Sequence, residues 1–342
     1  MSRNILNTLI FLCLLIAACD RKEDVVPGEP IPTVSTLAGG DEGFLDGTGS
    51  TAKFNKPVGI TLTPDGNLYV ADQGNRAIRK VTPEGVVTTV AKNLPSIGSI
   101  TCLAVTQNGT IYFSTDYGIY RLNPDNSVTT LALGSDNSYP FHNVRGMIAH
   151  TDGNLYLTHW SNARVTMMSP DGQITRFAGG LYDSNLGTNS GDRDGDLNYA
   201  LFDRPSDLCF GSDGAMYVTD VGSNKIRKIF NGQVITIAGS IANYGDGIGK
   251  DAAFWWPMGI AATPDGILYI VDNSNGRIRK MSTATGKVTT LAGGAWGSQN
   301  YLDGIGESAR FNGPTDILTT ADGSLLISDT NNNRIRKITF QK

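Results

Sequence analysis

Residues that build catalytic metal sites are scarce in this sequence, which has three histidines and four cysteines among its 342 residues. It also lacks the Gly-x-Ser-x-Gly turn that presents the nucleophile of many serine hydrolases. The net charge is only −4, so the composition provides no basic field for nucleic acid. These shortages disfavour hydrolysis by a serine nucleophile and predict that nucleic acid is not a partner.

Long apolar stretches are missing except at the N-terminus, where residues 5–18 follow Arg3. This run is too short to span a membrane comfortably as a helix, but it suits the apolar region of a secretion signal. Ala17 and Ala18 before Cys19 resemble the lipobox of bacterial lipoproteins, in which the cysteine becomes the lipidated first residue. An ordinary cleaved signal with a chance cysteine is the alternative. The sequence predicts a signal peptide over residues 1–18 and lipidation at Cys19.

A polar segment, DRKEDVVPGEPIP, follows Cys19. Such a charged, proline-containing stretch buries too little apolar surface to fold, so residues 19–32 are expected to form a flexible tether. Its acidic part resembles a segment by which some Gram-negative lipoproteins reach the outer face of the outer membrane, and a plain solvated linker explains it about as well. We therefore expect a lipid-anchored protein of the cell envelope, at the outer membrane, with its orientation left open.

Two cysteines remain once Cys13 leaves with the signal and Cys19 carries the lipid. Cys102 and Cys209 each lie in an apolar stretch, far apart in the sequence. Isolated buried thiols are favoured over a disulfide or a metal site, because free cysteine is among the most buried residue types.

Glycine, in contrast, is abundant, with 41 residues, and it marks a repeat. A turn containing Asp-Gly or Asn-Gly separates two apolar runs, because glycine accepts the positive φ that hairpin turns require. The runs at 58–62 and 68–72 flank one such turn, and a third run at 77–81 follows a polar loop. Six turns of this kind occur, at 63–66, 106–109, 150–153, 211–214, 263–266 and 320–323.

A fourth run, such as VTTLAGG at 288–294, completes only five of the six units. The sixth copy, VSTLAGG at 34–40, stands before the first unit, and no such run follows the last one. Pairing this N-terminal segment with the last unit would close a ring and remove open sheet edges. The sequence therefore predicts an all-β, six-bladed β-propeller of four-stranded antiparallel blades over residues 33–342.

The phrase NLYVADQGNRAIRK at 67–80 recurs at 215–228, 267–280 and 324–337. Together with Pro-x-Gly-Ile before the turn and VTTLAG after it, this phrase resembles the blade of NHL-repeat proteins. The units that begin near Pro57, Pro205, Pro257 and Pro314 carry it clearly, whereas units two and three depart from it. The resemblance implies a six-bladed scaffold. Some relatives of this kind are zinc-dependent amidating lyases, and related propellers are calcium-dependent lactonases.

An aspartate ends the second run in the four regular units, at Asp72, Asp220, Asp272 and Asp329. A ring of carboxylates could collect a cation, but aspartate also accepts hydrogen bonds from the backbone of its own turn, and we favour this structural role. The chain direction places these positions on the same face as four similar segments between units, and we call this face the elaborated face. The four segments are 46–59, 194–207, 246–259 and 303–316, and their phenylalanines, Phe54, Phe202, Phe254 and Phe311, are expected to pack between blades.

One of these segments, DRDGDLNYALFD at 192–203, has oxygen-bearing side chains at a spacing that resembles a calcium loop. It departs from that pattern, because Leu197 stands where the loop needs glycine and an aspartate replaces the final glutamate. The propeller repeat alone also explains part of the segment. We keep calcium as a tentative cofactor, with the candidate ligands Asp192, Asp194, Asp196, Asn198 and Asp203.

A zinc site built from histidines is disfavoured by their placement. His150 adjoins a hairpin turn on one face, while His159 ends the returning strand on the other. Five extended residues separate them by roughly 15 Å, too far to share one ion. No further cofactor is predicted.

Aromatic residues and histidines replace the repeated phrase in units two and three. We predict that this sector binds the ligand, with His159 and Trp160 as its anchors. The complete candidate set is His159, Trp160, Tyr117, Tyr120 and His142. Drift in a tolerant blade is the competing explanation.

The function predicted from the sequence is non-catalytic binding or scaffolding for a glycan or an envelope protein. The protein is expected to be a monomer that contacts the membrane only through its lipid anchor. The alternative is a metal-assisted lactonase or lyase with its site at the channel mouth, and a purely structural role is a third possibility. The ligand itself cannot be read from the repeat, because propellers support many functions on one scaffold.

Overall fold

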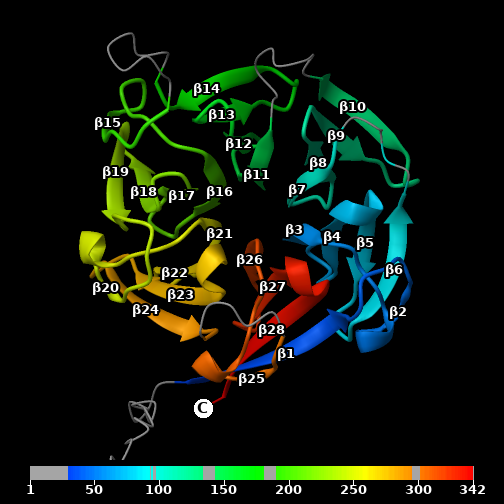
Figure 1. The fold of residues 1–342 in the computed structure, drawn as a ribbon. Helices are drawn as coiled ribbons and strands as arrows, with labels where there is room; N and C mark the ends of the chain where they lie inside the picture. Colours follow the sequence, from blue (N-terminus) through cyan, green and yellow to red (C-terminus); the bar gives the residue numbers. More distant parts are fainter. Residues whose placement is uncertain are drawn as a thin grey trace, which may run out of the picture.

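The computed structural model describes residues 30–92, 94, 98–133, 143–180, 190–294 and 301–341. Six antiparallel sheets form a ring around a central channel (Figure 1). The first strand of each sheet lines the channel and later strands lie farther out. The predicted all-β, six-bladed propeller is confirmed.

Each blade contains four main strands in the order of the chain, except that the last blade takes its fourth strand from the N-terminus. The blades are as follows: blade one, β3 (Pro57–Leu62), β4 (Leu68–Asp72), β5 (Ala77–Val81) and β6 (Val86–Ala91); blade two, β7 (Ile100–Val105), β8 (Ile111–Thr115), β9 (Gly118–Leu122) and β10 (Val128–Leu133); blade three, β11 (Val144–Ala149), β12 (Leu155–His159), β13 (Arg164–Met168) and β14 (Ile174–Ala178); blade four, β16 (Pro205–Phe210), β17 (Met216–Asp220), β18 (Lys225–Phe230) and β19 (Gln233–Ala238); blade five, β21 (Pro257–Ala262), β22 (Ile267–Asp272), β23 (Arg277–Ser282) and β24 (Lys287–Ala292); blade six, β26 (Asp316–Thr319), β27 (Leu325–Asp329), β28 (Arg334–Gln341) and β1 (Ile31–Gly39).

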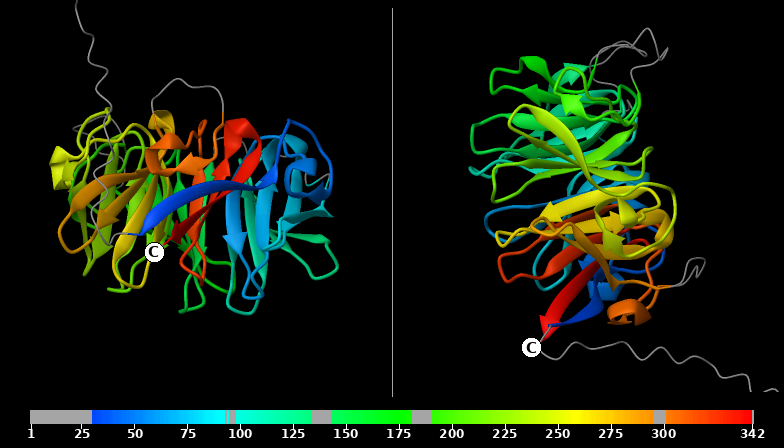
Figure 2. Two further views of the ribbon diagram at one scale, coloured as in Figure 1. Left: turned by 90° about the horizontal axis from the view of Figure 1, so that it is seen from below. Right: turned by 90° about the vertical axis from the view of Figure 1, so that its left-hand side faces the viewer.

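Hairpin turns join the first and second strands of every blade. Their glycines have φ between 74° and 88°, a conformation that side-chain-bearing residues rarely adopt. The second strands are almost entirely buried, because each is covered by a neighbouring blade on both faces. Figure 2 shows the ring from the side, with these turns at one face and the segments between blades at the other.

The elaborated face also carries short strands and 3-10 helices. Beside the four predicted strands, blades one, four, five and six each carry a fifth strand of two residues. The extra strand forms because the segment entering a blade crosses over it and pairs with its outer edge. These elements are β2 (Gly47–Thr48), β15 (Gly195–Asp196), β20 (Gly247–Ile248), β25 (Gly304–Ile305), η1 (Gly49–Thr51), η3 (Gly249–Asp251), η5 (Gly306–Ser308), and, after the second strands, η2 (Gln73–Asn75), η4 (Asn273–Asn275) and η6 (Thr330–Asn332).

The hydrophobic core is divided into clusters, several of which lie between neighbouring blades. Phe254, which is fully buried, packs between Tyr217 of blade four and Ile260 of blade five. Burial of one such side chain stabilises the fold by about 1.5–3 kcal/mol. The prediction that the four phenylalanines of the inter-blade segments pack between blades is confirmed.

The N-terminal strand closes the ring, as predicted. β1 pairs antiparallel with β28, from Ile31 opposite Gln341 to Gly39 opposite Arg334. β25 then pairs with the other edge of β1, so β1 is not the outermost strand. Val34 and Ala38 of β1 are buried against the neighbouring blades.

Removal of β1 should therefore destabilise the ring. A protein that begins at Asp41 would expose the edge of β28 and the apolar side chains that β1 covers. We expect a lower melting temperature and aggregation in size-exclusion chromatography, compared with a protein that begins at Pro30. A monomeric protein with unchanged melting would contradict this closure.

Candidate functional site

A buried arginine organises the elaborated face in each regular blade. In blade one, Arg79 Nη1 lies 2.8 Å from Asp72 Oδ2, and Arg79 Nη2 lies 2.7 Å from Asp46 Oδ1. The same guanidinium donates to the backbone carbonyl oxygens of Leu45 and Lys53. Asp72 Oδ1 in turn accepts from the backbone N–H of Asn55. One side chain thus fastens the inter-blade segment to the blade.

The same set of contacts recurs in blades four, five and six, and each arginine is completely buried. Burial raises the pKa of the inner aspartates, that of Asp220 to about 7, while Arg227 opposes this rise. These aspartates are structural, but they accept from a backbone N–H of the segment that enters the blade, not from the backbone of their own turn as predicted. The repeated sets are Arg227 with Asp220 and Asp194, Arg279 with Asp272 and Asp246, and Arg336 with Asp329 and Asp303.

The five candidate calcium ligands do not converge on one point. Because β15 pairs with β19 in the middle of this segment, successive side chains are directed to different partners. Among the described residues, no group of three or more His, Cys, Asp or Glu side chains is placed to hold a metal ion. The partners are Lys225 for Asp192, Arg227 for Asp194, Gln233 for Asp196, Arg176 for Asn198, and Ser190 and Arg204 for Asp203.

His159 is buried, which corrects its predicted role as a surface anchor. It occupies the position of Asp72 in blade three, and Thr166 occupies the position of Arg79. His159 Nε2 lies 2.7 Å from Thr166 Oγ1, so an uncharged pair replaces the ion pair. Burial lowers the pKa of His159 to about 4, and the ring is therefore neutral near pH 7.

The other histidines and tyrosines of the candidate set are dispersed. Tyr120 is fully buried and stacks on Phe113, which also corrects its predicted exposure to ligand, whereas Tyr117 is partly buried. His142 lies outside the described residues. His150, on the opposite face, packs on Phe210 with 4.1 Å between ring centroids.

Trp160, which is half-buried, is the member of the candidate set that lies beside two half-buried arginines and an exposed tryptophan. Its ring centroid is 5.6 Å from Arg145 Cζ and 6.0 Å from Arg204 Cζ. The ring of Trp256, which is exposed, meets it edge-on at 6.2 Å. We call these four residues the Trp160 cluster. The cluster joins blades three, four and five on the elaborated face.

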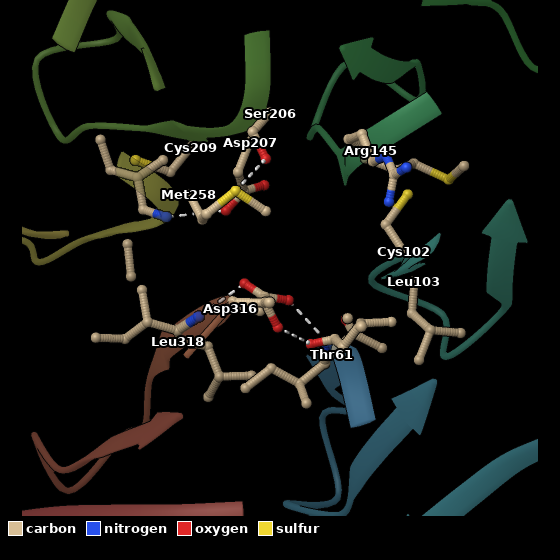
Figure 3. A pocket seen from close by; sticks show the side chains of 18 of the residues that line it. Thr61, Cys102, Leu103, Arg145, Ser206, Asp207, Cys209, Met258, Asp316 and Leu318 are labelled. Atoms are coloured by element: carbon tan, nitrogen blue, oxygen red, sulfur yellow. Dashed lines mark hydrogen bonds between the residues drawn. The ribbon is translucent and has the colours of Figure 1, made fainter. Parts of the chain in front are cut away.

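The central channel opens beside this cluster. Its cavity has a volume of about 500 Å³ and is lined mainly by the first strands of all six blades. Lys56 and Arg145 lie toward the elaborated face, because each stands at or before the beginning of a first strand. Figure 3 shows Asp207 and Asp316 pointing into the central space, with Arg145 beside Cys102 on another side.

Asp207 and Asp316 link the innermost strands to one another. Asp207 Oδ2 accepts from the backbone N–H of Ile260, at 2.9 Å, and Asp316 Oδ2 accepts from that of Ile60, at 2.7 Å. Both carboxyls keep some exposure to the channel but are surrounded by its walls. Burial raises the pKa of Asp316 to about 7, and burial together with the charge of Asp316 raises that of Asp207.

Sequence reasoning missed these channel residues, although a signal was present. Blades one and five begin Pro-x-Gly at Gly59 and Gly259, whereas blades four and six begin Pro-x-Asp. The glycine at this position lies close to the backbone of the next blade, since a Cβ on Gly259 would lie 2.7 Å from the Cα of Asp316. An aspartate at the equivalent position of another blade is therefore a departure from the repeat that the sequence shows. Arg145 could have been found in the same way, by its place beside Gly146.

Residues 49–292 match the virginiamycin B lyase family. The chain belongs to this family. Its similarity to NHL-repeat proteins is also confirmed: it is 28% identical over 317 residues to SUPPRESSOR OF QUENCHING 1 of Arabidopsis thaliana and 25% identical over 320 residues to NHL repeat-containing protein 2 of Homo sapiens. These alignments cover 89% and 88% of the chain but only 27% and 41% of the relatives, so the chain spans well under half of their length.

Solved structures share the fold. An auxiliary nutrient binding protein from Bacteroides thetaiotaomicron superposes with a TM-score of 0.73 at 20% identity, covering 91% of this chain and 77% of that one. A streptogramin B lyase superposes with a TM-score of 0.59 at 17% identity, covering 91% and 98%. At these identities the likeness shows the propeller architecture. Within the described part of the chain, no helix is long and apolar enough to cross a membrane.

The raised pKa of Asp316 predicts a pH-dependent stability. Between about pH 4 and 7 the folded state holds a proton on this carboxyl that the unfolded chain has lost, so stability falls as the pH rises through this range. Asp316→Asn should therefore show a smaller decrease of melting temperature between pH 5 and pH 8 than the wild type.

The test compares the wild type with Asp316→Asn by the slope of melting temperature against pH, because other groups titrate in the same pH range. His159, with its lowered pKa, contributes in the opposite direction, and Asp220 contributes in the same direction. Both are present in the two proteins and cancel in the difference. Identical slopes for the wild type and Asp316→Asn would contradict the prediction.

Proposed function

We propose that the protein is a binding module, without catalytic activity, that takes a glycan on its elaborated face. The observation that carries this proposal is a set of exposed aromatic rings, each held by an arginine. Flat aromatic side chains stack on the apolar faces of sugar rings. The pairs, with distances from Cζ to ring centroid, are Phe44 with Arg79 (4.8 Å), Tyr199 with Arg193 (3.8 Å), Tyr244 with Arg277 (3.8 Å) and Tyr301 with Arg334 (3.4 Å).

The support beneath these rings favours binding by a prearranged surface. Arg79 is fully buried and held by two carboxylates, so the ring of Phe44 rests on a fixed plane. A side chain that is already ordered loses less conformational entropy when a ligand arrives. The same argument applies to Tyr244, which contacts both Arg277 and the buried Arg279.

The Bacteroides thetaiotaomicron propeller described as an auxiliary nutrient binding protein gives this proposal a precedent on the same fold. Because that protein is only 20% identical to this chain, it supports the proposal only by showing that this fold can serve a binding protein. An envelope protein is the other ligand class that would use exposed aromatic residues, and the experiment below separates the two.

A lyase or lactonase with its site in the channel is the second candidate. Asp207 and Asp316 favour it, because carboxyls with raised pKa values in a cavity are typical of acid–base catalysis. However, both already accept backbone N–H groups that join neighbouring blades. In a related virginiamycin B lyase from Staphylococcus aureus, a histidine-to-alanine variant is described as catalytically inactive. Here His159 is buried and bonded to Thr166, and no histidine is among the described residues that line the channel.

Glycan binding can be tested by screening the purified protein against immobilised glycans. Replacing Trp256 with alanine should lower affinity for a bound glycan about 5- to 30-fold, corresponding to 1–2 kcal/mol, with little change in melting temperature. Trp160→Ala should have a similar effect, since Trp160 contacts Trp256 and both arginines.

Phe230→Ala is the matched control, because Phe230 is an exposed aromatic residue at the end of β18 on the opposite face. Equal weakening by Phe230→Ala would contradict a site on the elaborated face. Absence of glycan binding, combined with specific capture of an envelope protein, would replace the glycan by a protein ligand. Turnover of a lactone or a cyclic depsipeptide that is lost in Asp316→Asn would favour the enzyme.

We also propose that the propeller is tethered to the cell envelope through a lipid on Cys19. The Ala-Ala-Cys sequence after an apolar run supports this location. Two acyl chains hold a protein stably on a membrane, and among the described residues no helix could serve as a second anchor.

Cys19→Ala should therefore move the protein from the membrane fraction to the soluble fraction. A Cys102→Ala protein is the control, since Cys102 is buried inside the propeller and free. Membrane association of Cys19→Ala equal to that of the wild type would show that something other than the lipid retains the protein.

A further inference from the structure

The Trp160 cluster contains two arginines, and the described ion pairs match only one of them with a carboxylate. Arg145 lines the channel from β11, and its Nε atom is buried without a hydrogen-bond partner. Among the described residues Arg145 forms no ion pair. In contrast to the buried arginines of the regular blades, its guanidinium is not matched by two aspartates. This group can therefore pair with an anion supplied from outside.

Arg204 adds a second guanidinium to the same indole. It precedes Pro205 with a φ of 56°, a left-handed conformation. Its Nε lies 3.2 Å from Asp203 Oδ1, so a single carboxylate is paired with it. Together, Arg145 and Arg204 carry two positive charges near Trp160 against this one negative charge.

Lys56 extends the positive charge to the opposite part of the opening. It holds in blade one the position that Arg204 holds in blade four, directly before the first strand, and its φ of 52° is also left-handed. Lys56 is exposed and lines the channel cavity. The nearest channel carboxyls, Asp207 and Asp316, are deeper and are bonded to backbone N–H groups.

The exposed ring of Trp256 supplies an apolar platform beside these cations. The planes of the Trp256 and Trp160 rings are 70° apart. The face of Trp256 is therefore not parallel to the face of the indole that contacts the two guanidinium groups. A sugar ring can stack on Trp256 while an acidic substituent reaches Arg145 or Arg204. Arginine suits this task, because its planar fork binds a carboxylate or sulfate through two parallel hydrogen bonds.

We propose that the Trp160 cluster binds an acidic saccharide, one that bears carboxylate or sulfate groups. This inference rests on the proposed glycan-binding function and specifies its ligand class. Trp256 contacts the sugar ring, Arg145 and Arg204 pair with the acidic group, and Trp160 is a positioning residue that holds both guanidinium groups. Lys56 contributes a longer-range attraction at the channel opening.

The experiment compares acidic oligosaccharides with neutral counterparts of the same backbone by calorimetric titration of the purified protein. The pairs are oligogalacturonate with its methyl ester, oligoglucuronate with its methyl ester, and a sulfated chondroitin oligosaccharide with its desulfated form. We expect at least one acidic member to bind about 10-fold or more tightly than its counterpart, as charge-assisted pairing requires, and to weaken with added salt.

Arg145→Gln should lower the affinity for that acidic ligand about 10-fold while changing the affinity for the neutral counterpart less than about 2-fold. Arg204→Gln should act in the same direction. Lys56→Gln, at an exposed position, provides a variant whose folding is not in question, and a smaller loss is expected for the acidic ligand only. Arg121→Gln, an exposed arginine on β9, is the matched control and should change neither affinity.

The outcomes separate this inference from the function on which it rests. Equal affinity for acidic and neutral members would leave glycan binding intact and overturn the acidic specificity. Loss of both affinities to the same extent in Arg145→Gln and Lys56→Gln would also overturn it. Absence of binding to every saccharide of the panel and of the wider glycan screen would overturn the proposed function itself.

Discussion

The regular blades depend on one contact, the insertion of a buried guanidinium between two carboxylates. In blade one, Arg79 reaches Asp72 at the end of its own sheet and Asp46 in the segment that enters the blade. A buried charge is costly unless it is paired, and an arginine can satisfy two carboxylates and two carbonyl groups at once. The contact therefore specifies which segment lies over which blade. Removal of one partner would leave a charge in a dry environment, so the three groups have to be present together.

The divergent blades show what happens when this contact is absent. Blade three substitutes the neutral pair His159 and Thr166, and blade two places Thr115 and Tyr120 at the corresponding positions. Within the described residues, the sheets of these two blades have four strands, whereas the arginine fastens a short fifth strand in the other blades. Arg145 and Trp160 of blade three lie at the channel opening.

Much of the fold could be predicted because the same pattern of strands and turns occurs several times in the sequence. Hairpin glycines such as Gly66, the strand order and the closure by residues 34–40 all follow from aligning the units with one another. The site was harder to predict, because its members deviate from the repeat. His159 was expected to be a ligand anchor because it ends a strand on the elaborated face, but its position is the buried one that Asp72 occupies in blade one. The acidic spacing at 192–203 resembled a metal loop, while each of its carboxylates contacts a different side chain.

Another regularity became visible only in three dimensions. Around the channel, glycines at Gly59, Gly146 and Gly259 alternate with the larger residues Cys102, Asp207 and Asp316. Each glycine lies so close to the next strand that a Cβ would be within 2.7 Å of the backbone of the larger residue. The innermost strands thus alternate between a small and a larger residue around the channel, although the sequence repeats as six similar units.

The closure by β1 and β28 has a consequence for how the protein is made. The two strands that complete the last blade come from opposite ends of the chain, about 300 residues apart. During synthesis β1 is made before β28, and it waits without this partner until residues 334–341 have been added. Blades one to five can form in order along the chain, as domains commonly do, but the ring cannot be sealed before β28 has emerged.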